Sequence, residues 1–260
     1  MTLLDDLLAD LKAEGDQLRA TVEALGPNGW TRPTPAPGWT VATQVAHLLW
    51  TDETATAAAT DKEAWDAVVL QAIEDPTGFV DTSAHEVARL SPQALLVRWG
   101  KARTALTDAL RAYPAGEKMP WFGPPMSPAS MATARFMETW AHALDVYEAL
   151  GTTPETTDRI RHIAHLGVRT RNYAFSVHRL EPPAEEFRIE LKSPSGELWT
   201  WGPEDAEQSV RGSAYDFCLL VTQRVHRDDT DLVAVGGDAE RWLAIAQAFA
   251  GPPGEGRSPR

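Results

Sequence analysis

Apolar residues at spacings of three and four dominate the chain up to about residue 180, and this periodicity is the strongest constraint on the fold. The first example runs from Leu3 to Leu25 and ends at Gly26-Pro27. Such spacing places apolar side chains on one face of an α-helix, so the pattern predicts amphipathic helices that pack against one another. Similar patterns predict helices over 41–60, 61–75, 92–113, 130–150 and 154–180, whereas residues 77–91 have no clear assignment.

The pattern changes after Pro183. Residues 186–202 alternate apolar and polar side chains around Ser195-Gly196, which predicts a β-hairpin. Further strands are expected near 206–213 and 231–237, and further helices over 214–226 and 238–249. We therefore expect an α+β protein in three parts: a helical domain over 1–152, a bridging helix with a smaller α+β domain over 153–252, and a disordered tail over 253–260.

Composition restricts the classes of partner. The net charge is −13 and no basic patch interleaves with aromatic residues, which argues against nucleic acid. The start of the chain lacks the features of a signal peptide, and no apolar run is long enough to span a bilayer, which argues against a membrane. A single cysteine, Cys218 in "DFCLLV", favours a core thiol in a reducing compartment. We expect a cytoplasmic monomer or homodimer that acts on a small molecule.

The stretch "FMETWAHALD" places Glu138 and His142 four residues apart in an apolar helix. Residues at this spacing lie one turn apart on the same face, so both side chains can reach a common point. A metal ion needs at least one more protein ligand, and His47 in "TQVAHLLW" is the best candidate. Two packed helices can bring one histidine to a Glu/His pair. Asp145 is a candidate partner for a ligand histidine, whereas Asp52 lies off the face of His47 and is not counted as a ligand.

Ordinary explanations exist for the same residues. A histidine in an apolar helix is commonly a hydrogen-bonded core residue, and a Glu–His pair at this spacing is commonly a surface pair. A buried carboxylate without partners is costly, however, and Glu138 is flanked by Phe136, Met137 and Trp140. This setting favours a functional role for the carboxylate and leaves the structural alternatives open.

Several segments resemble a known family. "PGWTVATQVAHL" and the later "ETWAHALDV" are similar to the DinB-like superfamily, and more closely to the mycothiol-dependent maleylpyruvate isomerase family of actinobacteria. The stretches "HLGVRTRNYAF" and "FCLLVTQR" extend the resemblance to an actinobacterial group of metal-binding proteins. The resemblance implies a DinB-like four-helix bundle with a C-terminal α+β domain. It also implies a divalent metal, usually zinc, held by His47, Glu138 and His142.

The resemblance further implies a chemistry. In the family a low-molecular-weight thiol, mycothiol, binds the metal as thiolate and attacks an electrophile, which leads to transferase or isomerase activity. Three protein ligands leave a coordination position open, as in catalytic sites. Two histidines and one carboxylate also suit Fe²⁺, Ni²⁺ or Mn²⁺. We expect a metal-dependent enzyme that activates a thiol or water for addition to a small electrophilic substrate.

Residues elsewhere are candidates for contacting the substrate. His165, Arg169 and Tyr173 recur at a spacing of four on the predicted helix over 154–180, where they could hold an anion and transfer a proton. A polar face between domains is the alternative explanation. The loop "WFGPPMSP" directly precedes the helix with Glu138, so it could form one lip of the site or serve as a plain connector.

Three other functions remain open at this stage. The first is a metal-dependent hydrolase, hydratase or lyase acting on a small acid or acyl thioester. The second is a non-catalytic protein that binds a metal or a small ligand. The third is a structural bundle without a metal.

Overall fold

The computed structural model describes residues 2–260 and divides the chain into two compact units, Met1–Pro154 and Glu155–Arg260. The first unit is helical, and the second combines helices with a four-stranded sheet, so the predicted α+β class is confirmed. The predicted domain boundary at residue 152 lies close to this division. Residues 253–260 contain no helix or strand.

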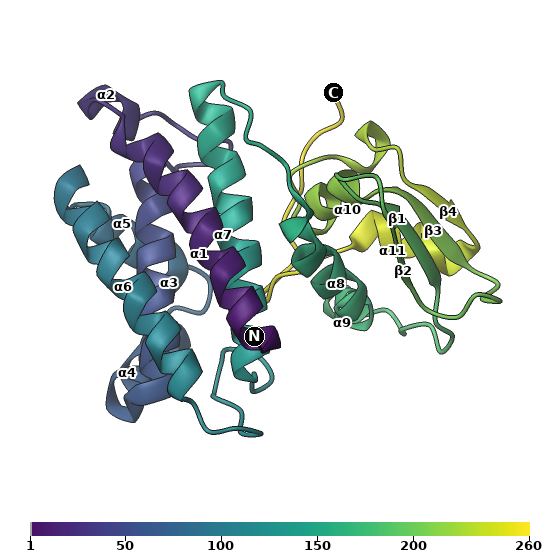
Figure 1. The fold of residues 1–260 in the computed structure, drawn as a ribbon, viewed down its shortest axis with the longest axis horizontal. Helices are drawn as coiled ribbons and strands as arrows, with labels where there is room; N and C mark the ends of the chain where they lie inside the picture. Colours follow the sequence, from purple (N-terminus) through teal and green to yellow (C-terminus); the bar gives the residue numbers. More distant parts are fainter. Residues whose placement is uncertain (1) are drawn as a thin grey trace. The chain divides into compact units, whose positions relative to one another are not determined.

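The first unit is a bundle of four long helices that lie side by side (Figure 1). Each begins at a Thr or Ser whose side chain accepts a hydrogen bond from a backbone N–H of the first turn, the usual N-cap arrangement. Gly151 ends the last of them in the left-handed conformation, with φ of 68°. The four helices are α1 (Leu3–Glu23), α3 (Val41–Thr60), α6 (Pro92–Ala112) and α7 (Pro128–Leu150).

Three shorter helices complete this unit: α2 (Pro27–Trp30), α4 (Lys62–Glu74) and α5 (Phe79–Val87). The last of these occupies the region that the sequence pattern left unassigned. Helix α5 buries only Ala84 and has no side-chain N-cap at Gly78, so it lacks the usual signals of a helix. Its contacts with α3 and α4 therefore hold it in place.

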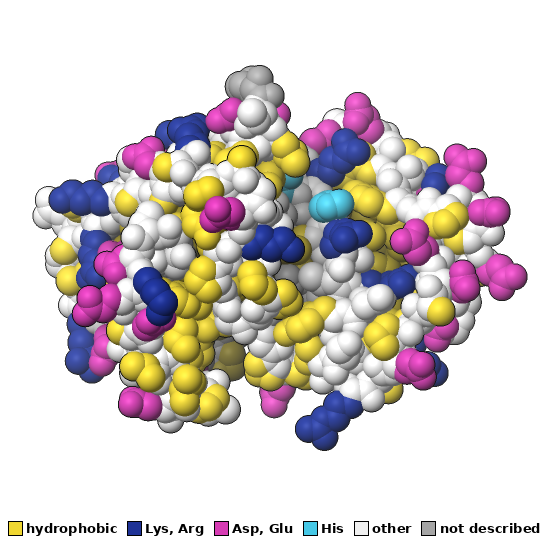
Figure 2. Space-filling model, turned by 90° about the horizontal axis from the view of Figure 1, so that it is seen from below, with side chains coloured by type: hydrophobic (Ala, Val, Ile, Leu, Met, Phe, Trp, Pro, Cys, Tyr) yellow, Lys and Arg dark blue, Asp and Glu magenta, His cyan; other side chains and the backbone are white. Residues whose placement is uncertain are grey.

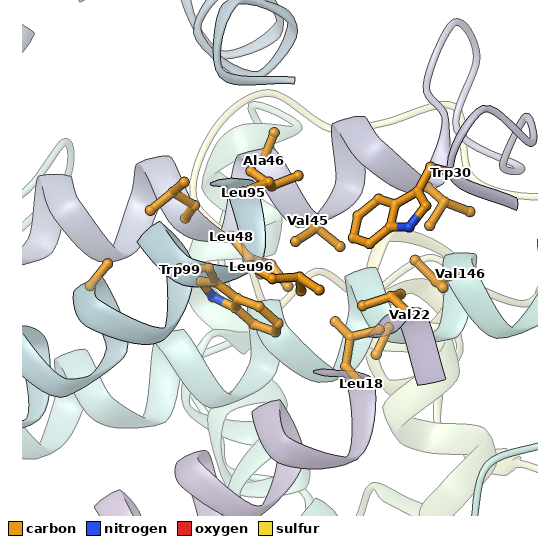
Figure 3. Packing of buried hydrophobic residues seen from close by; sticks show 14 of the residues in the cluster. Leu18, Val22, Trp30, Val45, Ala46, Leu48, Leu95, Leu96, Trp99 and Val146 are labelled. Carbon is orange, nitrogen blue, oxygen red and sulfur yellow. The ribbon is translucent and has the colours of Figure 1, made fainter. Parts of the chain in front are cut away.

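The core of the bundle is formed by apolar side chains from all four long helices (Figure 3). In Figure 3, Val45 of α3 lies between Trp99 of α6 and Trp30 of α2, and Leu48 of α3 lies next to Trp99. Burial of such side chains contributes roughly 1.5–3 kcal/mol each to folding. Helix α3 packs on both α6 and α7, so two of its faces are buried in the bundle.

A charged network lies inside this bundle. Arg135 of α7 donates a hydrogen bond from Nε to Asp52 of α3 at 3.0 Å, and Trp99 of α6 donates from Nε1 to the same carboxylate at 3.1 Å. All three side chains are buried. Charges removed from water are tolerated only when they are paired, so this network ties three helices together at one level of the bundle.

The helix predicted over 154–180 is not continuous, and that prediction was wrong. The structure has a short 3₁₀ helix, η1 (Asp158–Ile160), followed by α8 (Arg161–Arg169) and α9 (Arg171–Val177). The break lies at Thr170, whose hydroxyl donates to the backbone oxygen of Gln247 at 2.8 Å and also contacts Leu166 and Gly167 oxygens. Hydroxyl contacts of this kind compete with regular helix geometry, and no apolar pattern reveals them.

The sheet of the second unit has the strand order β2-β1-β3-β4, with β1 and β3 parallel and both outer pairs antiparallel. Strand β1 buries Ile189 and Leu191 and leaves the alternate residues toward solvent, as the alternating pattern predicted. Helices α10 and α11 contact the sheet (Figure 1). The elements are β1 (Arg188–Lys192), β2 (Leu198–Trp201), β3 (Ser209–Ser213), α10 (Ala214–Val221), 3₁₀ helix η2 (Arg227–Asp229), β4 (Val233–Val235) and α11 (Gly237–Ile245).

The charge distribution agrees with the acidic composition. Figure 2 shows Asp and Glu side chains scattered over the face in view, with apolar side chains between them. None of the helices within residues 2–260 combines the length and the apolar character needed to cross a membrane.

The buried network yields a stability prediction. We expect Asp52→Ala to lower the free energy of unfolding by about 3–5 kcal/mol, because it leaves the guanidinium of Arg135 buried without its carboxylate. Urea unfolding of the chelator-treated protein measures this change.

The adjacent Glu53 provides a matched control. It forms an ion pair with Arg98 that is partly exposed to solvent, so Glu53→Ala should cost at most about 1 kcal/mol. Equal losses in the two variants would contradict the role assigned to the buried pair.

Candidate metal centre

Three side chains from two helices converge within the first unit. His47 of α3 and Glu138 and His142 of α7 each offer one ligand atom, and these atoms all lie within 4.8 Å of one another. The Nε2 atom of His47 is 3.4 Å from Oε2 of Glu138, and the Nε2 atom of His142 is 3.2 Å from the same oxygen. Ligand atoms around a tetrahedral Zn²⁺ are roughly 3.3–3.6 Å apart, given bond lengths of about 2.0–2.2 Å. The predicted residues are therefore close to the geometry of a metal site.

The convergence follows from local helix geometry combined with the packing of α3 on α7. Glu138 and His142 share a face because they are one turn apart. His47 belongs to the other helix, and its position depends on how the two helices align. The Asp52–Arg135 contact aligns them: Asp52 lies five residues after His47 on α3, and Arg135 lies three residues before Glu138 on α7.

Electrostatics favour a negative carboxylate beside a neutral imidazole. Burial lowers the pKa of His47 to about 4, and the neighbouring His142 acts in the same direction. For Glu138, burial alone would raise the pKa, but hydrogen bonds with His142 and His47 hold it well below its usual value. Metal ligands must be deprotonated, and these directions match that requirement at neutral pH.

Gln44 orients one of the ligands. Its Oε1 atom lies 2.5 Å from Nδ1 of His142, and its Nε2 donates to the hydroxyl of Thr34 at 2.9 Å. An amide oxygen only accepts, so Nδ1 of His142 donates to Gln44. In the neutral ring this leaves Nε2, the atom that faces Glu138, with the lone pair that can bind a metal ion. Metal-bound histidines commonly donate their other ring N–H to such an acceptor, so the Gln44 contact fits a bound metal ion.

Trp39 covers the site on one side. Its ring stacks on His142 with centroids 5.7 Å apart and tilts against His47 at 5.3 Å. The indole Nε1 donates to Asp81 at the start of α5 at 3.1 Å. The cluster is not fully sealed, because the side chain of Glu138 retains 24% of its exposure.

Sequence reasoning missed Gln44 and Trp39. Gln44 is a fully buried polar residue three positions before His47, on the same face of α3, and this spacing was the available signal. Asp145, the predicted partner of a ligand histidine, is buried on α7, but the contact with Nδ1 of His142 comes from Gln44. Asp52, which was not counted as a ligand, pairs with Arg135.

The other candidate residues lie in the second unit. His165 and Arg169 are exposed on α8, and Nδ1 of His165 accepts a hydrogen bond from Trp201 at 3.3 Å. Burial lowers the pKa of His165, with Arg169 and His162 adding to the effect. Tyr173 lies on α9, beyond the break at Thr170, and its hydroxyl is bound to the backbone of Gly251. The single helical face expected for all three residues is therefore not present.

Cys218 is a core thiol, as predicted. It is fully buried on α10, and its Sγ atom contacts the backbone oxygen of Ile160 at 3.4 Å. Burial raises the pKa of this thiol well above its usual value. Cys218 is thus suited to packing and not to nucleophilic attack.

Comparisons with solved structures reveal the fold. The chain is similar to the crystal structure of a mycothiol-dependent maleylpyruvate isomerase, with a TM-score of 0.58 and 14% identity over 90% of this chain and 95% of that chain. A histidine-to-alanine mutant of such an enzyme gives a TM-score of 0.57 at the same coverage. At this level of identity the likeness establishes a shared fold alone.

Sequence comparisons reveal the family. Two curated relatives from Mycobacterium tuberculosis, strains CDC 1551 and H37Rv, are each 58% identical over 250 residues, covering 96% of this chain and 97% of theirs, and both are called an uncharacterized protein. The family model for wyosine base formation matches residues 183–235. The model for the mycothiol maleylpyruvate isomerase N-terminal domain matches residues 11–147, which is more than half of the chain. The chain therefore belongs to the mycothiol maleylpyruvate isomerase family.

Proposed function

We propose that the first unit binds one divalent metal ion through His47, Glu138 and His142, and that the protein is an enzyme that uses it. The observation that carries this proposal is the convergence of three ligand atoms within 4.8 Å, with two histidine nitrogens directed at one carboxylate oxygen. Zn²⁺ is the first candidate, because two histidines and one carboxylate form a common catalytic zinc set. Fe²⁺, Ni²⁺ and Mn²⁺ are alternatives with the same donor types.

We further propose that the reaction adds a thiol or water to a small electrophilic substrate, as a thiol transferase or isomerase would. A bound divalent cation supplies the means by lowering the pKa of a thiol or water toward neutrality. Mycothiol is the first candidate thiol, because the enzyme whose fold this chain shares is described as mycothiol-dependent. The buried Cys218 is not needed as a nucleophile in this scheme.

The chain's own residues have distinct tasks in this scheme. Glu138 supplies a negative charge at the exposed edge of the cluster, so that the two neutral imidazoles and one carboxylate leave the loaded site with a net positive charge. Such a charge favours an anionic nucleophile. Gln44 holds the proton of His142 on Nδ1, and the stacked ring of Trp39 excludes water from one side of the ligands.

We also propose that His165, Arg169 and Tyr173 serve the substrate. The exposed Arg169 guanidinium is suited to a carboxylate, and His165 is suited to proton transfer because Trp201 directs the proton of its neutral form to Nε2. Tyr173 would hold the backbone of Gly251 in place, because its hydroxyl accepts a hydrogen bond from the Gly251 N–H. This part of the proposal rests on the local chemistry of the second unit.

The first test is metal content. Purified protein should carry about one divalent ion per chain, and His47→Ala, Glu138→Ala and His142→Ala should each reduce this to less than about 0.2, because two remaining ligands bind weakly. Elemental analysis after dialysis measures the content. His85→Ala, which removes an exposed histidine on α5, should leave it unchanged. Equal metal content in all four variants would exclude the site.

A second test concerns Gln44. We expect Gln44→Ala to weaken Zn²⁺ binding by about 10- to 100-fold. Without the Oε1 acceptor, the proton of the neutral His142 ring is no longer held on Nδ1 and can occupy Nε2, the atom that binds the metal. Gln44→Glu retains an acceptor and should restore most of the affinity. Competition with a chromogenic chelator gives the dissociation constants, and ¹⁵N NMR reports the position of the His142 proton. An Nδ1 atom without a proton in the wild-type apoprotein would contradict the assigned role.

A third test addresses the reaction. At pH 7 the zinc-loaded protein should accelerate addition of mycothiol to maleimidoacetic acid by about tenfold or more over the chelated protein, because more of the thiol is ionised. Arg169→Ala should raise KM for this carboxylate-bearing electrophile by about tenfold, while N-ethylmaleimide, which has no carboxylate, is unaffected. Metal-independent rates would refute the thiol proposal, and equal KM changes for both electrophiles would remove Arg169 from the site.

A further inference from the structure

A row of aromatic rings leads away from the candidate metal centre. The ring of Trp50 on α3 lies 6.1 Å from that of His47, Phe79 on α5 lies 5.8 Å from Trp50, and Phe122 lies 5.4 Å from Phe79. We call Trp50, Phe79 and Phe122 the aromatic row. Its members come from two helices and from the loop that precedes α7, so they are distant in sequence and meet only in the fold.

The aromatic row is not a sealed core. Trp50 and Phe79 are partly exposed, and Phe122 at the far end is 40% exposed. Behind the row, Trp65 of α4 is buried and contacts both Phe122 at 5.1 Å and Trp121 at 5.8 Å. The buried Trp65 therefore supports a ring that stays open to solvent. Apolar surface of this kind costs free energy when it is left exposed, unless a ligand covers it.

The chemistry around the row restricts what could cover it. The carboxylate of Asp81 accepts a hydrogen bond from Trp39, whose ring packs on His47 and His142, so a negative charge lies close to the ligands and disfavours an anionic group there. The rings meet edge-on or tilted, at 72° between Trp50 and Phe79 and 56° between Phe79 and Phe122. Each ring contacts the next one in the row, and an added aromatic group can pack against tilted rings of this kind in the same way. A neutral, planar, apolar group lying along the row fits best.

We propose that the substrate at this metal centre carries a neutral aromatic or conjugated apolar arm, which lies along Trp50, Phe79 and Phe122 while its polar end reaches the metal. This inference rests on the proposed function and names its substrate class. It also assigns the predicted lip of the site: Phe122 belongs to the loop "WFGPPMSP" and forms the outer end of the row.

Hydroxamic acids of increasing length test the arm, because each has the same metal-binding group. Binding to the zinc-loaded protein is measured by calorimetry for acetohydroxamic, benzohydroxamic and 4-phenylbenzohydroxamic acid. We expect the affinity to rise by about tenfold with the first ring and again with the second, since each ring gains stacking contacts. Replacing the second ring by a carboxylate should abolish that second gain.

Two variants locate the contacts. Phe79→Leu keeps an apolar side chain but removes the ring, and it should weaken both ring-bearing ligands by about fivefold or more. Phe122→Ala changes a loop residue that is already exposed, and it should reduce only the gain from the second ring. Acetohydroxamic acid should bind all variants equally. Leu70→Ala, which removes an exposed apolar side chain on α4 that is not part of the row, is the matched control and should change nothing.

The outcomes separate the two proposals. Equal affinity for all three acids, or tighter binding of the carboxylate-bearing acid, would overturn the apolar arm while leaving the metal site intact. A ring preference that both Phe variants retain would also overturn it. If acetohydroxamic acid does not bind the zinc-loaded protein, the bound ion has no open position for a ligand, and the proposed chemistry and the arm proposal both fail while metal binding stands.

Discussion

The buried contact between Asp52 and Arg135 is the constraint on which the candidate site depends. It joins α3 to α7 inside the bundle, and Trp99 adds a hydrogen bond from α6. Sliding one helix past the other would leave two charges apart from each other and from water, at a cost of several kcal/mol. Apolar packing alone tolerates small shifts more readily. The ion pair therefore selects the alignment in which His47 faces Glu138 and His142.

Around this alignment the site is organised in successive layers. Glu138 and His142 are one turn apart and need only their own helix, whereas His47 requires the packed pair. Gln44 then fixes the tautomer of His142, and Trp39 covers the imidazoles from the loop before α3. The contacts of Gln44 and Trp39 depend on the convergence of the three ligands, since a fixed tautomer or a stacked ring assists metal binding only where the ligands already meet.

Two segments were the least well predicted from the sequence, one in each unit. Helix α5 has no side-chain cap and buries little, so no pattern predicted it, yet it contributes Phe79, which packs on Trp50, and Asp81, which accepts a hydrogen bond from Trp39. The helix predicted over 154–180 is interrupted because the hydroxyl of Thr170 bonds to distant backbone at Gln247. In both cases tertiary contacts outweighed local preference, which is a weak guide wherever few apolar residues are buried.

The sequence by itself determined the long helices, their caps and the pairing of Glu138 with His142, because these depend on spacings of three and four and on side chains that bond to neighbouring backbone. The α+β character of the second unit was equally local, since it follows from alternation along each strand. Only the tertiary structure decided that His47, ninety-one positions before Glu138, meets that pair, and that Gln44 and the aromatic row lie beside it. Helix periodicity specifies which face is buried, but the alignment of two helices depends on side chains from both at once.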